Sequence, residues 1–115
     1  MSFLFKKVCI ASDHAGFNLK EIIKDYLIDK HVSIFDLGPY KNKSVDYPDY
    51  AKRLAKRVKD KKSDIGILVC GSGTGMAISA NKIKDIRAAV CYNQKSTRLS
   101  RQHNNANIIA LGARL

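Results

Sequence analysis

The stretch that decides the fold is residues 67–76, ILVCGSGTGM, in which a β-branched apolar run meets a loop with three glycines. The apolar run predicts a buried strand that ends at Cys70, and the residues from Thr74 onward predict a helix. A strand, a glycine-rich turn and a helix in this order are typical of an α/β protein with a parallel sheet. Ligands bind beyond the carboxyl ends of the strands in such sheets, so this loop is a candidate site.

Apolar runs and amphipathic helical patterns alternate along the whole chain, with no repeat or linker between them. At 115 residues, of which 45% are apolar, the chain suits one domain, residues 1–115. We expect an α/β fold, a three-layer αβα sandwich around a five-stranded parallel, Rossmann-like sheet that is covered on both faces. The expected strands are 7–12, 32–38, 65–70, 86–92 and 106–112, the expected helices are about 17–30, 49–61, 74–83 and 94–102, and one long loop covers 38–48.

The chain is strongly basic, with 21 Lys and Arg against 10 Asp and Glu and a formal net charge of +11. Such a field attracts anions, among them nucleic acid, acidic membrane surfaces and phosphorylated metabolites. In the densest basic run, residues 52–62, apolar residues recur at helical spacing, so the charges are expected on a solvated helix face. We therefore expect a small phosphorylated partner rather than nucleic acid.

The sequence shows no sign of a membrane segment. No apolar run approaches the roughly 18 residues that a spanning helix needs. The first 14 residues lack a signal peptide's order of basic segment, apolar segment and cleavage site. These features predict a cytoplasmic protein that has no membrane partner.

The three cysteines, Cys9, Cys70 and Cys91, are odd in number and widely spaced, which argues against a disulfide framework or a zinc site. Cys9 and Cys91 lie within apolar runs and are expected to be buried packing residues. Cys70 stands where a following helix would favour its thiolate, so it is a candidate nucleophile, redox thiol or general base. A simple buried cysteine at a strand end is the alternative.

The glycine spacing excludes two nucleotide-binding loops. The dinucleotide fingerprint needs Gly-x-Gly-x-x-Gly, but position 76 is Met and no acid follows at the expected distance. A Walker loop would need Gly-Lys where Met76 and Ala77 stand. A cradle for an anion is the remaining functional interpretation, because glycines allow close approach and a helix start offers N–H groups. A tight turn without a ligand is the alternative.

Other polar residues are expected beside this loop. Asp13 and His14 follow the first strand, His103 and Asn104 end the last helix, and Arg114 follows the last strand. Each has a simpler alternative, such as an aspartate that caps a helix or a histidine that favours a helix end. Together they predict that a thiol, a carboxylate, two imidazoles and a guanidinium meet at one edge of the sheet. That set suits proton transfer on a small anionic substrate.

Five segments resemble ribose-5-phosphate isomerase B and its relatives, a family that includes the galactose-6-phosphate isomerase subunits. They are ASDHAGFNLK (11–20), VDYPDYA (45–51), CGSGTGMAISANK (70–82), IRAAVCYN (86–93) and SRQHNNANIIALGAR (100–114). The resemblance implies an aldose–ketose isomerase that interconverts ribose 5-phosphate and ribulose 5-phosphate through an enediolate, in the pentose phosphate pathway. It also implies a homodimer or tetramer and no metal or organic cofactor.

The resemblance assigns roles to the glycine loop. It makes Cys70 the base that moves the proton, since relatives without this cysteine use a Glu at the position of Met76. The hydroxyl of Ser72 would assist the proton transfer. The enediolate oxygens would be held by the backbone of Gly71, Ser72, Gly73, Thr74 and Gly75.

The resemblance also assigns roles outside the loop. His103 would open the furanose ring with Asp13 as its helper. Substrate ligands would be His14, Asn104 and Arg114, with Arg114 on the phosphate, and Asp46 and Tyr47 would lie near the sugar. In the family, His103, Asn104 and Arg114 reach the site across the dimer interface.

One difference from the family lies beyond Leu115, where relatives continue into a further helix with basic phosphate ligands. A chain without that helix is expected to keep the fold, to bind phosphate and pair with a second subunit more weakly, and to have weak or no activity. Two other functions are considered. One is isomerisation of a six-carbon sugar phosphate, allose or galactose 6-phosphate, by the same mechanism, and the other is a flavodoxin-like binding module.

Overall fold

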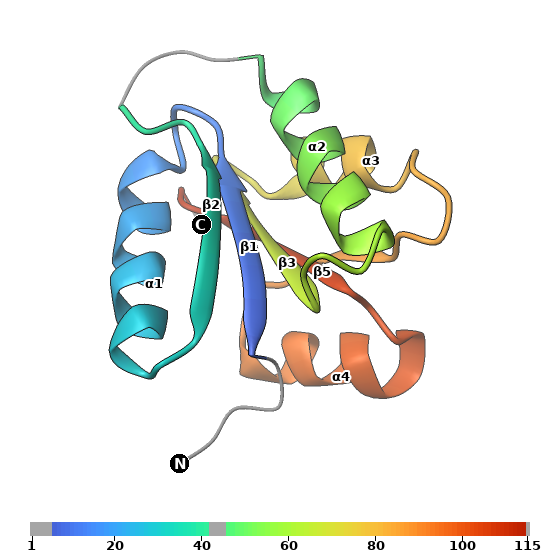
Figure 1. Ribbon diagram of the computed structural model, residues 1–115. Helices are drawn as coiled ribbons and strands as arrows, with labels where there is room; N and C mark the ends of the chain where they lie inside the picture. The colour runs from blue at the N-terminus through green and yellow to red at the C-terminus, as the bar shows by residue number, and fades with distance from the viewer. Residues whose placement is uncertain (1–5, 42–45, 115) are drawn as a thin grey trace.

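The computed structural model describes residues 6–41 and 46–114. It contains one parallel sheet of five strands in the order β2-β1-β3-β5-β4 (Figure 1). The strands are β1 (Lys7–Ser12), β2 (Ser33–Gly38), β3 (Ile65–Cys70), β4 (Ala88–Val90) and β5 (Ile108–Gly112). The helices between them are α1 (Phe17–Asp29), α2 (Tyr47–Lys59), α3 (Thr74–Ala80) and α4 (Gln94–Asn104). The expected five-stranded parallel α/β fold is confirmed.

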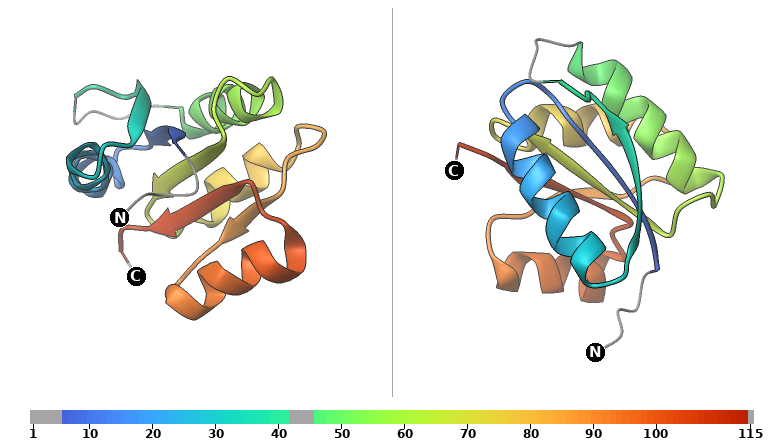
Figure 2. Two further views of the ribbon diagram at one scale, coloured as in Figure 1. Left: turned by 60° about the horizontal axis from the view of Figure 1, so that its bottom comes forward. Right: turned by 60° about the vertical axis from the view of Figure 1, so that its left-hand side comes forward.

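Helices cover both faces of the sheet, as the nearly continuous apolar strands require. On one face, α2 and α3 bury Leu54 and Met76 against Cys9, Leu68 and their neighbours. On the other face, α1 packs against a second cluster formed around Ile10 and Val69. Helix α4 lies on the same face of the sheet as α1 (Figure 2). Leu19 of α1 and Thr97 of α4 accordingly line one hollow.

The elements differ from the prediction mainly at their ends. Helix α2 begins two residues earlier than expected, with Pro48 in its first turn, where the missing N–H of proline costs no helical hydrogen bond. Helix α3 ends at Ala80, and the side chain of Asn81 then pairs with both the N–H and the C=O of Ala88 in the edge strand. Strand β4 has three residues and is shorter than the expected strand 86–92. The last residue of helix α4 is Asn104, and the residue that caps it, Asn105, has a left-handed backbone conformation.

The two cysteines predicted to be packing residues are buried, with Cys9 fully enclosed and Cys91 4% exposed. Burial raises the pKa of the Cys9 thiol to about 11, against smaller opposing effects of Ser63 and Arg57. A thiol held this firmly in its neutral form behaves as a small apolar residue.

A fully buried lysine, which the sequence did not indicate, joins α1 to β2. Nζ of Lys20 lies 2.7 Å from Glu21 and 2.8 Å from Asp36, and Lys24 contacts the same two carboxylates. Burial would raise the pKa of Asp36, but hydrogen bonds from Lys20 and Lys24 outweigh it and lower that pKa. Asp36 also accepts a hydrogen bond from the N–H of Gly38, so the cluster fixes the end of β2.

Two structural findings concern membranes and metals. No helix among residues 6–41 and 46–114 is long and apolar enough to cross a membrane. Within the same residues, His, Cys, Asp and Glu side chains form no group of three that could hold a metal ion.

Candidate active site

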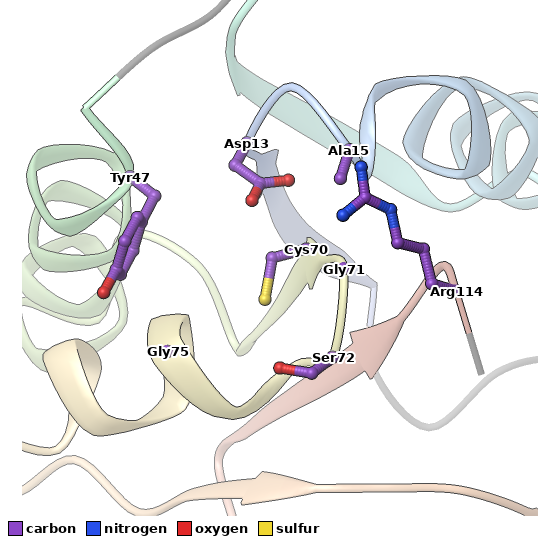
Figure 3. Close-up of a pocket in the computed structure, with 8 residues that line it drawn as sticks. All are labelled: Asp13, Ala15, Tyr47, Cys70, Gly71, Ser72, Gly75 and Arg114. Carbon is purple, nitrogen blue, oxygen red and sulfur yellow. The ribbon is translucent and has the colours of Figure 1, made fainter.

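A hollow of about 440 Å³ opens at the carboxyl ends of the strands. It lies where the strand order reverses, since Asp13 follows β1 and Cys70 ends the adjacent β3. This switch point is where open parallel sheets bind ligands. The residues that line the hollow are Asp13, Ala15, Tyr47, Cys70, Gly71, Ser72, Gly75 and Arg114 (Figure 3).

Cys70 lies at the floor of this hollow, 5% exposed, as the last residue of β3. Its Sγ accepts a hydrogen bond from the N–H of Gly73 at 3.0 Å. This hydrogen bond fixes the position of the sulfur at the start of the glycine loop. Figure 3 shows the sulfur facing the space between Asp13 and Ser72.

Gly73 can bring its N–H to the sulfur because it is a glycine. Its φ is +84°, in the left-handed region that side chains disfavour. A Cβ here would also stand 3.1 Å from the carbonyl oxygen of Ala110 in β5. Gly73 is therefore needed because the loop passes close to strand β5. The spacing of the glycines in the sequence did not reveal this contact.

The loop uses two of its own N–H groups internally. Besides Gly73, Thr74 donates its N–H to the hydroxyl of Ser72 at 3.2 Å. Neither Gly73 nor Thr74 is among the residues that line the hollow, whereas Gly71, Ser72 and Gly75 are. The loop thus consists of residues that face the hollow and residues that hold the sulfur and the hydroxyl in place.

The side chain of Asp13 makes a local hydrogen bond and also borders the hollow. Its Oδ1 accepts a hydrogen bond from the N–H of Gly16 at 2.9 Å, which supports the start of α1, and its carboxyl group lines the hollow. Gly16 is a residue that the sequence analysis did not single out. A Cβ at that position would collide with the carbonyl oxygen of Val69, so the glycine lets α1 begin directly against β3.

Tyr47 and Arg114 form the two sides of the hollow (Figure 3). The ring of Tyr47 lies over Gly75, with Cε1 3.1 Å from where a Cβ would be. Arg114 is placed by its backbone, which donates to the carbonyl oxygen of Gly71 at 3.0 Å. Its guanidinium reaches the hollow from its own chain, so no interface is needed to bring it there. Arginine is well suited to hold a phosphate.

His14, His103 and Asn104 do not line the hollow. His14 is exposed in the loop before α1. His103 and Asn104 are exposed at the end of α4, and the expectation that they share the edge of Cys70 within one chain is wrong. A helix that leads into a parallel strand ends at the amino end of that strand, which is the opposite edge of the sheet. A contribution across an interface stays a prediction.

Known proteins resemble this chain over most of its length. A family model described as Ribose/Galactose Isomerase matches residues 8–115. The chain is 44% identical to ribose-5-phosphate isomerase B of Escherichia coli strain K12 over 110 residues, which are 96% of this chain and 74% of that protein. A solved ribose 5-phosphate isomerase of Thermotoga maritima superimposes with a TM-score of 0.93 at 51% identity, covering 95% of this chain and 75% of that one. Ribose-5-phosphate isomerase B of Mycoplasma genitalium, solved with bound ribulose 5-phosphate, gives a TM-score of 0.87 at 44% identity, covering 93% and 72%.

Proposed function

The chain belongs to the ribose/galactose isomerase family, and we propose that it interconverts ribose 5-phosphate and ribulose 5-phosphate. The observation that carries this proposal is the hydrogen bond from the N–H of Gly73 to Sγ of Cys70, at the floor of a hollow beside Arg114. The bound ribulose 5-phosphate of the Mycoplasma genitalium relative supports the choice of substrate.

Cys70 is the base in this proposal. Its thiolate takes the proton from C2 of the open-chain aldose and leaves an enediolate. The same sulfur returns a proton to C1, which gives the ketose, so no other reactant is needed. Between the two transfers the sulfur carries the proton as a neutral thiol, and the N–H of Gly73 donates to the thiolate before the first transfer and after the second. Met76, at the position where some relatives carry a Glu, is fully buried and apolar, so it offers no competing base.

The oxyanion of the enediolate lies on the glycine loop. The backbone of Gly71 and Gly75 borders the hollow, and the hydroxyl of Ser72 stands beside it to pass a proton between the two oxygens. Preorganised N–H donors around a developing negative charge are a large source of rate acceleration. On either side, Arg114 binds the phosphate and Tyr47 packs against the sugar.

Ring opening needs a second acid and base, because ribose 5-phosphate exists mainly as a furanose. We propose that His103 and Asn104 of a second copy supply it, with Asp13 of the first copy as helper and His14 as a further substrate ligand. Their exposure at the end of α4 is compatible with that role. The assembly proposed is thus a cytoplasmic homodimer, or a tetramer of two dimers.

A direct assay tests this function. The chain is incubated with ribose 5-phosphate and ribulose 5-phosphate is measured, for the wild type, Cys70→Ala and Cys91→Ala. We expect turnover by the wild type and by the Cys91 variant, and a loss of roughly a thousandfold for Cys70→Ala, as for other proton-transfer residues. Turnover of the folded Cys70 variant at the wild-type rate would contradict the role of Cys70, and an inactive wild type would contradict the function.

A second candidate substrate follows from the family description, which names galactose beside ribose. A six-carbon sugar phosphate would use the same base and anion cradle. Steady-state kinetics with ribose, allose and galactose phosphates separates the two, and we expect the highest kcat/KM with ribose 5-phosphate.

A further inference from the structure

The end of α4, which presents His103 and Asn104, is held by a side chain from another part of the chain. Nε of Arg87, which directly precedes β4, donates a hydrogen bond to the carbonyl oxygen of Asn104 at 2.5 Å. The last carbonyls of a helix have no partners within the helix, and a cation there also complements the helix dipole. Arg87 therefore supplies both a donor and a charge at the turn that carries His103.

Arg87 is itself fixed in place by Asn107. The side chain of Asn107 accepts from the backbone N–H of Arg87 at 2.9 Å and donates to the carbonyl oxygen of Asp85 at 3.1 Å. The backbone N–H of Asn107 also donates to the carbonyl oxygen of Arg87 at 3.0 Å. These bonds tie Arg87 to the start of β5, so its guanidinium reaches α4 from the sheet.

The backbone conformation of the next residue, Asn105, ends helix α4 directly after Asn104. Asn105 has a left-handed φ of 50°, and its N–H donates to the carbonyl oxygen of Arg101. The guanidinium of Arg101 donates in turn to the carbonyl oxygen of Ala106. An exposed helix end without such contacts frays, which would leave His103 without a fixed direction.

We propose that Arg87 is a positioning residue for ring opening: it fixes the end of α4 so that His103 and Asn104 enter the hollow of a second copy. The inference rests on the proposed isomerase function and adds a residue that touches no substrate. It predicts that loss of Arg87 impairs the step that uses His103 and spares the step that uses Cys70.

The chemistry of the two sugars separates those steps. Ribose 5-phosphate must open its furanose ring before proton transfer. Ribulose 5-phosphate has no such ring, because closing it would need the oxygen that bears the phosphate. In D₂O, Cys70 can remove a proton from C1 of ribulose 5-phosphate and return a deuteron to the same carbon. This exchange needs the base and the anion cradle and does not need ring opening.

The test compares Arg87→Ala with Arg98→Ala, which removes the same charge from an exposed position of α4. Turnover of ribose 5-phosphate and deuterium incorporation at saturating ribulose 5-phosphate are both measured. For Arg87→Ala we expect turnover to fall about tenfold, the size of one hydrogen bond to a charged group, with exchange close to the wild-type rate. Arg98→Ala should match the wild type in both.

Two results would overturn the role of Arg87. One is unchanged turnover in Arg87→Ala, and the other is an equal fall in turnover and exchange, which would indicate a general structural effect. A wild-type chain that neither isomerises nor exchanges would instead contradict the proposed function, so the two failures are distinguishable.

Discussion

The two edges of the sheet differ in how many of the candidate site residues they bring together within one chain. At the carboxyl edge, loops after β1, β3 and β5 bring Asp13, Cys70 and Arg114 around one hollow. At the amino edge, His103 and Asn104 stand exposed at the end of α4, held by Arg87. The difference follows from topology, because in a parallel sheet every strand delivers its carboxyl end to the same edge. In the proposed mechanism, proton transfer therefore uses the residues of one chain, and ring opening uses the amino edge of a second copy.

Gly73→Ala is expected to have the largest effect at the carboxyl edge, because it disturbs the hydrogen bond to Cys70. Alanine at φ +84° costs about 1–2 kcal/mol and would press on Ala110, so the N–H that serves Cys70 would move. We expect kcat to fall roughly a hundredfold, as for loss of one preorganised donor, while the protein stays folded in a thermal melt. A variant that keeps full kcat would show that this hydrogen bond is dispensable.

Asp36→Asn tests the ion pair with Lys20 that fixes the carboxyl end of β2. It leaves the buried Lys20 without its charge partner across to β2, and we expect a loss of about 3 kcal/mol in unfolding free energy. Asp25→Asn, which removes an exposed carboxylate of α1, is the matched control and should change little.

The pH dependence of stability has a definite sign. Because the folded pKa of Asp36 is lowered, its contribution is complete above the ordinary aspartate pKa of about 3.9 and is lost as the pH falls through the lowered value. Chemical denaturation between neutral and acid pH should therefore show a smaller decline in Asp36→Asn than in the wild type. Parallel curves would contradict this linkage.

Arg114→Gln is expected to have a smaller effect, confined to binding. Loss of the guanidinium should raise KM for ribose 5-phosphate about tenfold and leave kcat within about twofold, because the phosphate is distant from the reacting carbons. Arg98→Gln serves as the control for the loss of charge. A fall in kcat at unchanged KM would place Arg114 at the proton-transfer step instead.

Much of the carboxyl edge could be predicted because it depends on local order in the sequence. The apolar run before Cys70 set β3, and the glycines and the helix pattern after it set the loop. Gly16, Gly73 and Lys20 could not be explained in advance, since their roles come from contacts with Val69, Ala110 and Asp36 on other elements. His103 was assigned to the wrong edge because a helix before a strand was treated like a loop after one.

The most direct test of the account mixes two inactive variants. Cys70→Ala and His103→Ala are each expressed alone, and the two are also co-expressed so that mixed dimers form. Turnover of ribose 5-phosphate is measured for all three samples. If His103 serves the hollow of a second copy, a mixed dimer contains one intact site, and random pairing should restore about a quarter of the wild-type activity. A mixture no more active than its two components, or a His103 variant that retains full activity alone, would contradict a site divided between two copies.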